Sequence, residues 1–287
     1  MGGIDLVGRF VLAHLQAESI LRAYHAGRDS VTASLDLGLT TSNISLAASG
    51  ARLPDGQSLT WETLEEVTRS SQVCFAVEEN RLHKIQVFSE ETQRLYSLMP
   101  TTGAPTMLIS GIPMHRIKGT DPHRDTLQKI KAVSPIVGRV LDTATGLGYT
   151  AIEAAKNAGQ VITIELDPAA LEVARLNPWS RALFDNPQIE QRIGDSFDVI
   201  EELDDATFDR IIHDPPVFSL AGHLYSGDFY RELYRVLKPR GRLFHYIGDP
   251  ESKSGRSISR GAAQRLRQAG FRRVARQPAA FGLTAYK

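Results

Sequence analysis

The stretch that decides the fold is Val140-Leu141-Asp142-Thr143-Ala144-Thr145-Gly146-Leu147-Gly148-Tyr149-Thr150. An apolar strand runs through a Gly-x-Gly turn into a helix, and the glycines let the backbone approach a ligand closely. Ala151 occupies the glycine-or-alanine position of a dinucleotide fingerprint, so the turn alone leaves a dehydrogenase open. Asp142 argues against one, because a carboxylate before the turn suits a cationic or hydroxyl-bearing group better than a pyrophosphate.

Three further acidic residues follow predicted strands. Glu165 ends an apolar strand about twenty residues past the turn, where an acid accepts hydrogen bonds from ribose hydroxyls. Asp195 comes after the next strand and is placed to accept from the exocyclic amine of an adenine. Asp214 precedes Pro215 and Pro216, which hold an extended path at the carboxyl end of the fourth strand. Open α/β sheets bind their ligands at that edge.

Strands alternate with helices from residue 121 onward, which predicts a parallel sheet covered on both faces. Strands are expected at 140–143, 161–166, 190–193, 210–213, 242–247, 274–277 and 283–286. Helices are expected at 121–132, 150–157, 168–177, 197–202, 226–236 and 259–269. The last two strands leave no room for a crossover helix, so they should form an antiparallel hairpin.

The N-terminal part has a different pattern and no catalytic constellation. An amphipathic helix is expected within 4–24 and a second helix at 60–67. Short strands are expected at 31–37, 43–47, 73–78, 82–88 and 94–98. A chain of 287 residues fits two domains. We therefore predict a helix with a small, mostly-β domain in residues 1–120 and an α/β domain in 121–287.

Composition excludes several classes of protein. With 42% hydrophobic and 23% charged residues, the chain is expected to be globular rather than disordered. The single cysteine, Cys74, rules out an internal disulfide framework and a zinc site of several thiolates, and no metal is expected. No stretch reaches the ~18 apolar residues of a membrane span, so we expect a cytoplasmic protein that does not bind membranes.

Charge is unevenly distributed, although lysine plus arginine and aspartate plus glutamate both number 33. Residues 238–287 carry 12 basic and only 2 acidic side chains. This asymmetry favours a polyanionic partner, and the alternative is a solvated basic surface. The sequence does not indicate an oligomeric state.

Together, the glycine turn, Glu165, Asp195 and Asp214-Pro215-Pro216 resemble the class I S-adenosylmethionine-dependent methyltransferases over roughly residues 125–287. The blocks 110–116 and 213–226, with their Asp-Pro-Pro-x-Phe-Ser motif, further resemble predicted archaeal methyltransferases of unsettled substrate. The family implies a Rossmann-like seven-stranded sheet and S-adenosylmethionine as cofactor. It implies cofactor contacts from Asp142, Thr143, Ala144, Gly146, Leu147, Gly148, Tyr149, Glu165, Leu166, Asp195 and Ser196.

The same resemblance implies that Asp214, Pro215, Pro216 and Phe218 face the methyl acceptor. An Asp/Asn-Pro-Pro-aromatic sequence is typical of methyltransferases that act on planar nitrogens. Here Val217 takes the aromatic position, and the form is more similar to some ribosomal RNA base methyltransferases. We therefore predict a nitrogen of an RNA base, in tRNA or rRNA and possibly a guanine ring nitrogen, as the acceptor. The basic C-terminal region would bind the RNA.

Alternatives remain open from the sequence. The segments 165–168 and 224–230 resemble aminopropyltransferases, which share the fold and use decarboxylated S-adenosylmethionine. Those enzymes have a more glycine-rich first loop and a second acid near the Asp-Pro pair. A non-catalytic cofactor-binding module and a protein or lipid methyltransferase are further possibilities. Carbon-5 methylation of pyrimidines is set aside, because Cys74 lies far from this region. His115 and His213 are either proton carriers or ordinary structural histidines.

Overall fold

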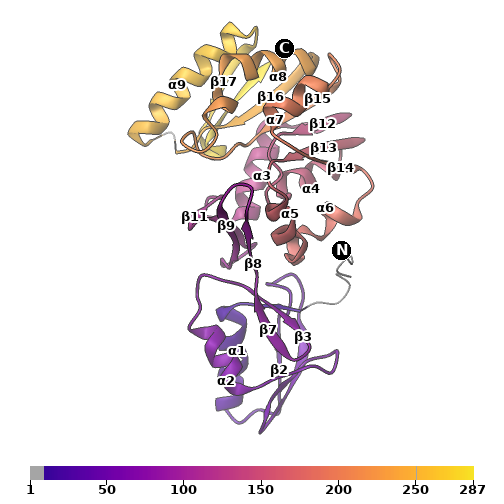
Figure 1. Ribbon diagram of the computed structural model, residues 1–287, viewed down its shortest axis with the longest axis vertical. Coiled ribbons are helices and arrows are strands. Elements are labelled where there is room, and N and C mark those ends of the chain that lie inside the picture. Colours follow the sequence, from indigo (N-terminus) through magenta and orange to yellow (C-terminus); the bar gives the residue numbers. More distant parts are fainter. Residues whose placement is uncertain (1–9, 250) are drawn as a thin grey trace. The chain divides into compact units, whose positions relative to one another are not determined.

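The computed structural model describes residues 10–249 and 251–287, which form two compact units (Figure 1). One unit comprises the chain up to Pro122 together with Ala169–Arg181, and the other comprises His123–Pro168 and Ala182–Lys287. The sequence did not predict that residues 169–181 belong to the first unit. Within that unit, Trp179 Nε1 donates a hydrogen bond to the Leu37 carbonyl oxygen at 3.1 Å.

The second unit is built on a seven-stranded sheet with the order β14-β13-β12-β15-β16-β18-β17. All neighbouring pairs from β14 to β16 are parallel, and β18 is antiparallel to both β16 and β17. The predicted final hairpin and the methyltransferase-like α/β sheet are therefore confirmed. The strands are β12 (Arg139–Asp142), β13 (Gln160–Glu165), β14 (Ile189–Ile193), β15 (Phe208–His213), β16 (Leu237–Tyr246), β17 (Arg272–Gln277) and β18 (Gly282–Tyr286).

Helices cover both faces of this sheet. On one face, α7 (Ser196–Val199), α8 (Gly227–Val236) and α9 (Lys253–Gln268) pack with alternate strand residues such as Leu141 and Leu243 into one core. Strand side chains alternate between faces. The intervening residues therefore point to the other face, where α4 (Tyr149–Ala155) contacts β12, β13 and β14. The unit also contains nearly all of α3 (Pro122–Val133), part of α6 (Arg181–Asp185) and the 3-10 turns η2 (Ile200–Glu202) and η3 (Gly222–Tyr225).

Two boundaries differ from expectation. The helix expected at 259–269 begins earlier, since α9 starts at Lys253 and the Ser252 side chain accepts from the Gly255 amide as its N-cap. The strand expected from 242 begins at Leu237. Leu237 pairs with Phe208 of β15, the register then shifts, and regular pairing resumes where Arg242 lies opposite Arg210. Propensity places element ends poorly, since tertiary pairing decides them.

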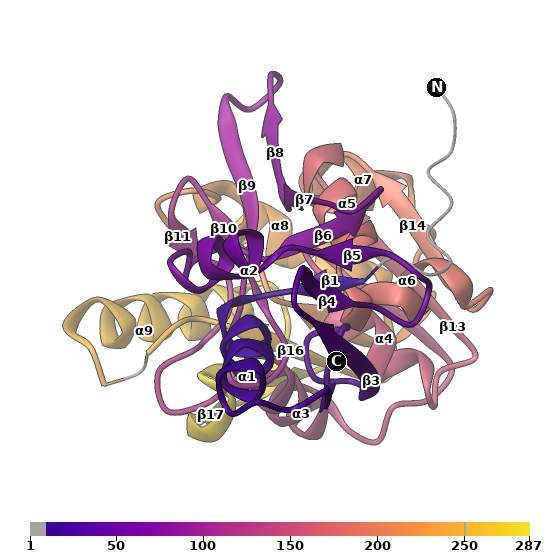
Figure 2. The same ribbon diagram turned by 90° about the horizontal axis from the view of Figure 1, so that it is seen from below.

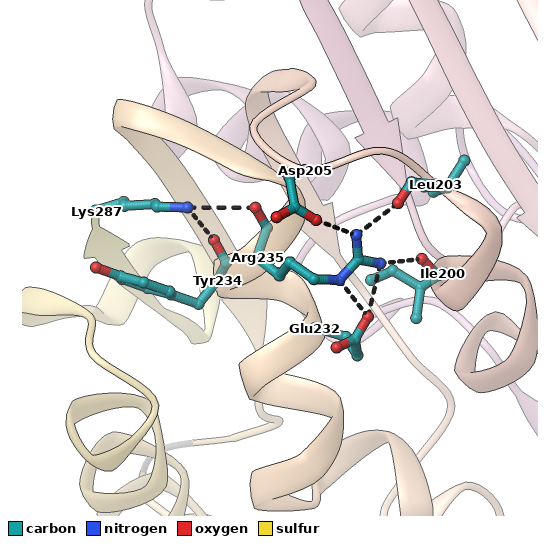
Figure 3. A network of polar contacts seen from close by, with 7 residues as sticks. All are labelled: Ile200, Leu203, Asp205, Glu232, Tyr234, Arg235 and Lys287. Atoms are coloured by element: carbon teal, nitrogen blue, oxygen red, sulfur yellow. Dashed lines mark hydrogen bonds and ion pairs between the residues drawn. The ribbon is translucent and has the colours of Figure 1, made fainter.

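The carboxyl end of α8 is held by a polar network (Figure 3). Arg235 donates to the carbonyls of Ile200 and Leu203 and pairs with Asp205 and Glu232. Lys287 Nζ donates to the carbonyls at the end of α8, which is the favourable placement for a cation relative to the helix dipole. These contacts connect α8 to η2 and to the last residue of the chain.

The first unit contains three small sheets, with strand orders β1-β6-β7, β11-β10-β9-β8 and β2-β3-β4-β5. Helix α1 (His14–His25) and α2 (Trp61–Thr68) pack on a core of their own, and the Thr60 side chain caps α2 by accepting from the Thr63 amide. The helix predicted within 4–24 begins only at His14, because 11–12 pair with β6; its part in 4–9 lies outside the described residues. The β8–β9 hairpin is seen in Figure 2. The strands are β1 (Val11–Leu12), β2 (Ser30–Ala33), β3 (Ser42–Ala47), β4 (Gly50–Arg52), β5 (Ser58–Leu59), β6 (Phe75–Glu78), β7 (Arg81–Lys84), β8 (Gln86–Ser89), β9 (Arg94–Met99), β10 (Thr106–Ile109) and β11 (Ile112–Pro113).

Helix α5 (Pro168–Arg175) starts where the sequence predicts. Across the residues that the structure describes, no helix is both long and apolar enough to cross a membrane.

Candidate functional site

The glycine turn lies at the carboxyl end of β12 and leads directly into α4. Gly146 and Gly148 have φ values of 50° and 76°, a region that disfavours side chains with a Cβ. A Cβ on Gly148 would also lie 2.7 Å from Leu183 Cδ2, so this position needs glycine for both reasons. The turn therefore brings bare backbone to the edge of the sheet where a ligand is expected.

Asp142 is fully buried at the end of β12. Its Oδ2 accepts hydrogen bonds from Thr150 Oγ1 at 2.9 Å and Thr163 Oγ1 at 3.1 Å, whereas Oδ1 has no partner within the described chain. Burial raises the pKa of Asp142 to about 7, and the nearby charge of Asp214 adds to this effect. A buried carboxylate oxygen without a donor fits a ligand that carries positive charge or N–H and O–H groups.

Glu165 ends β13 beside the turn. Its Oε2 accepts from the Gly146 amide at 2.7 Å and its Oε1 from the Asp167 amide at 3.2 Å. Burial raises the pKa of Glu165 to about 7. Glu165 thus holds the glycine turn in place, while further lone pairs remain for ribose hydroxyls because a carboxylate has about four acceptor sites.

Asp195 and Ser196 connect β14 to the rest of the site. Asp195 caps α7 by accepting from the Phe197 amide at 2.8 Å, and it lies 2.9 Å from His223 Nε2. Ser196 Oγ donates to the Thr143 carbonyl oxygen at 2.6 Å, which ties the end of β14 to the end of β12. His223 was not among the predicted site residues, although it lies in the block 213–226 that the sequence singled out.

Apolar side chains remain exposed at this edge of the sheet. Leu166 follows β13 and Ile193 ends β14, and both are exposed. A flat apolar ring between such side chains would remove their surface from water, which is favourable. With the unpartnered oxygen of Asp142 and the acceptors of Glu165, these residues fit S-adenosylmethionine, which has an adenine, a ribose and a cationic end.

Three predicted cofactor residues have buried side chains. Thr143 Oγ1 lies 2.7 Å from His213 Nδ1, and Leu147 and Tyr149 are buried beneath the turn. Their contribution to a ligand would come through the backbone. Ala144, by contrast, is half-buried and lies on the turn itself.

The Asp-Pro-Pro segment follows β15. Tyr225 Oη donates to the Pro216 carbonyl oxygen at 3.1 Å, and the Tyr225 ring meets Phe218 edge to face at 5.4 Å between centroids. Phe218 and Val217 are nevertheless about half exposed. The segment therefore has its Pro216 carbonyl held by Tyr225 and presents apolar side chains to the exterior.

Asp214 is paired with a residue that the sequence analysis missed. Lys129 Nζ of α3 lies 2.6 Å from Asp214 Oδ2 and 3.1 Å from Asp125 Oδ2, and 4.6 Å from the centre of the Tyr246 ring. The Lys129 side chain is only 2% exposed. Its spacing from Asp125, four residues along one helix, was the available signal, but nothing in the sequence shows that this helix face meets Asp214.

His213 is not placed to carry protons. It is fully buried, with Nδ1 bonded to Thr143 and Nε2 2.9 Å from the Leu224 carbonyl oxygen. Burial lowers the pKa of His213 to about 3 and also lowers that of its neighbour His245, so both are neutral near pH 7. His213 is therefore an ordinary structural histidine rather than a proton carrier. His115 lies in the first unit, with Nδ1 3.0 Å from Thr106 Oγ1, and its role stays a prediction.

The basic C-terminal residues divide into two groups. Some are engaged within the unit: Lys238 pairs with Asp209, Arg242 donates to the Ser134 carbonyl, and Arg265 donates to the Tyr225 carbonyl. Others on α9 and β17 are exposed, namely Arg256, Arg260, Arg267, Arg272, Arg273 and Arg276. These six exposed residues, here together called the arginine surface, are fewer than the 12 basic residues counted in 238–287.

Comparison with known proteins places the chain in a family. It is 45% identical over 239 residues to the uncharacterized protein MJ1233 of Methanocaldococcus jannaschii, covering 83% of this chain and 81% of that protein. The chain belongs to the MJ1233 family. Residues 140–241 also match the family model described as a methyltransferase domain. The second unit of this MJ1233-family chain thus has a class I methyltransferase-type fold, and the predicted cofactor, S-adenosylmethionine or a molecule derived from it, is confirmed. The individual residues that would contact it stay predictions.

Polyamine enzymes are also similar to the chain, over a shorter stretch. The polyamine aminopropyltransferase of Mycobacterium tuberculosis is 34% identical over 129 residues, which is 42% of this chain and only 25% of that protein. The crystal structure of the spermidine synthase from Thermotoga maritima aligns with a TM-score of 0.55 and 21% identity, covering 70% of each chain. A spermidine synthase with the transition state analogue AdoDATO aligns with a TM-score of 0.57 and 22% identity, over 70% and 71%. These structures show the shared fold.

Proposed function

We propose that this protein is an S-adenosylmethionine-dependent methyltransferase that acts on a nitrogen of an RNA base in tRNA or rRNA. The observation that carries the proposal is the Asp-Pro-Pro segment, in which Asp214 is close enough to Asp142 to influence its ionisation and is followed in the chain by the exposed Val217 and Phe218. An acceptor base and the cofactor would thereby meet at one edge of the sheet. The arginine surface of the same unit supports a substrate that carries phosphates.

The residues of this chain would act mainly by positioning. S-adenosylmethionine supplies a methyl group on a positively charged sulfur, and transfer requires an in-line approach of the acceptor nitrogen. Glu165 and the glycine turn would hold the ribose end, and Asp142 would face the cationic end. Asp214 and the Pro215 carbonyl would accept a hydrogen bond from the acceptor and orient its lone pair. Phe218 would lie against the base and help to exclude water.

Transfer of an aminopropyl group is the second candidate, supported by similarity to the polyamine aminopropyltransferase of M. tuberculosis. The acceptor in that reaction is a polyamine, whose reacting amine must be deprotonated but whose other amines are cationic, and carboxylates are the natural partners of those cationic amines. Here Asp214 is already paired with Lys129. This pairing favours an acceptor that carries no positive charge beside the reacting nitrogen.

The test is to incubate the purified protein with methyl-labelled S-adenosylmethionine and, separately, with decarboxylated S-adenosylmethionine labelled in the aminopropyl group. Each reaction contains RNA, a polyamine mixture and a protein extract, which are then separated. We expect methyl label in RNA alone. Label in polyamines from the decarboxylated compound would establish the second candidate, and methyl label in protein alone would contradict the RNA assignment.

Asp214→Asn is the matched variant for this assay. It keeps the shape of the side chain but removes the charge that faces Lys129, and it should lower methyl transfer by roughly 10²-fold or more if Asp214 orients the acceptor. Cofactor affinity should stay within about threefold of the parent, by calorimetry, because that affinity rests on the glycine turn and Glu165. The control is Asp204→Asn, at an exposed loop position of the same unit. A transfer rate close to that of the parent would remove Asp214 from the acceptor site.

A further inference from the structure

Lys129 is a charged side chain enclosed within a folded unit. Of the largest side chains that are fully buried, it is the charged one, alongside residues such as Tyr230 and Phe244. Removing an ammonium from water costs several kcal/mol in proteins, and an ion pair recovers that cost only with good geometry. A packed apolar residue would serve stability equally well. The presence of the charge therefore calls for another explanation.

The groups around the Lys129 ammonium are those of an amine-binding site. Asp214 contributes a carboxylate oxygen at 2.6 Å and Asp125 another at 3.1 Å, and the Tyr246 ring lies at 4.6 Å from Nζ. Carboxylates and an aromatic face are the standard means by which proteins hold a cationic amine. Burial alone lowers the pKa of Lys129, but the charges of Asp214 and Asp125 outweigh it and hold that pKa above its usual range, so the ammonium stays charged.

An incoming ligand would meet this arrangement at Asp214, which is half-buried whereas Asp125 and Lys129 are buried. A cationic amine would find one oxygen of Asp214 already neutralised and a positive charge directly behind it. Two like charges that approach within a few ångströms repel each other strongly near a protein surface. A neutral N–H group meets no such repulsion and can use the lone pairs that Asp214 retains.

We infer that Lys129 occupies the position of a substrate ammonium and so determines the charge of the acceptor, excluding cationic polyamines and admitting a neutral nitrogen. Lys129 is in this view a specificity-determining residue that acts through Asp214. The inference rests on the proposed function in one respect, namely that Asp214 faces the acceptor. It specifies which chemical class that acceptor belongs to.

The experiment removes the Lys129 ammonium and replaces it with an ammonium compound added to the solution. Lys129→Ala removes three methylenes and the amine, which is the composition of propylammonium. By calorimetry and thermal melting, propylammonium chloride should bind the variant saturably and raise its melting temperature, while 1-propanol of the same shape should not. The control, Lys131→Ala at an exposed position of α3, should respond to neither compound. Absence of saturable amine binding to a folded Lys129→Ala would overturn the inference.

A second measurement begins with the parent protein, whose result does not depend on the folding of any variant. Putrescine should show no saturable binding to the parent. The Lys129→Ala variant, where it folds, should bind putrescine saturably. Saturable putrescine binding to the parent that Asp214→Asn abolishes would overturn the inference. Neither measurement involves RNA or methyl transfer. If RNA is not methylated but both amine results hold, the proposed function fails and the role of Lys129 stands. If RNA is methylated but the amine results fail, the proposed function stands and the role of Lys129 is overturned.

Discussion

Asp142 is the residue at which burial and ionisation oppose each other most directly. Its carboxyl group is fully buried, with two threonine hydroxyls on Oδ2 and no partner on Oδ1 within the described chain. Burial raises its pKa to about 7, against 3.8 for an exposed aspartate. The unfolded chain therefore releases this proton at a lower pH than the folded protein does. Free energy of unfolding is lost as pH rises from about 4 to about 7, by at most about 1.4 kcal/mol per pH unit for this group.

Asp142→Asn removes that titration while keeping an oxygen for Thr150 and Thr163. The unfolding free energy of the variant, relative to the parent, should rise with pH across the window from about 4 to about 7. Urea unfolding of both proteins at several pH values measures this difference. Glu165 also titrates near 7, but it is present in both proteins and cancels. A difference that is constant between these pH values would show that Asp142 ionises normally.

Helix α9 shows how one element serves both packing and surface charge. Ala262 and Leu266 of this helix are buried in the core with α8 and the sheet. Arg265, also on α9, donates from Nε to the Tyr225 carbonyl oxygen at 2.9 Å, whereas Arg267 is exposed. Arg265 and Arg267 point in different directions because residues two apart on a helix lie about 200° apart. Which of them turns inward was decided by the Tyr225 segment.

Arg265 and Arg267 of α9 make a matched pair for mutagenesis. Arg265→Met keeps the stem but leaves the Tyr225 carbonyl without its donor, which should lower the unfolding free energy by about 1–3 kcal/mol. Arg267→Met should change it by less than about 0.5 kcal/mol. Chemical denaturation of the two variants and the parent provides the comparison. Equal losses from both substitutions would mean that the Arg265 hydrogen bond contributes nothing.

On the scale of the whole molecule, a net charge of zero conceals a local excess of arginine. The arginine surface lies on α9 and on β17, the edge strand of the seven-stranded sheet. If it contacts phosphates, the logarithm of the RNA association constant should fall linearly with the logarithm of salt concentration, by about 0.7 to 0.9 per phosphate neutralised.

Glutamine at Arg260, Arg267, Arg272 and Arg273 should reduce that slope by up to about 3 units without changing cofactor affinity. Filter binding or fluorescence anisotropy at a series of salt concentrations measures it. The control replaces four exposed arginines of the first unit by glutamine, namely Arg22, Arg28, Arg52 and Arg81, and so makes the same change in net charge. If the two quadruple variants lose the same slope, overall charge is responsible and the arginine surface is not the binding site.

Local sequence was sufficient for the architecture of the second unit. Hydrophobic strands separated by helical segments predicted its parallel sheet, and the short gap before 283–286 predicted the antiparallel hairpin, because both features depend on neighbours in the chain. The glycine turn and Glu165 were also found together, since their spacing is that of one βαβ unit. The same local signals failed at the ends of β16 and α9, where pairing and capping decide.

Sequence by itself thus determined the sheet, the contact of the glycine turn with Glu165 and the class of cofactor, because each rests on residues close in the chain or on backbone rules. Only the tertiary structure decided the partner of Asp214, since Lys129 is 85 residues away and no local pattern records which helix face meets the end of β15. It likewise decided that Arg265 is engaged and that His213 is buried and neutral. Long-range packing fixes which charges remain available, and that availability determines which acceptor the site can bind.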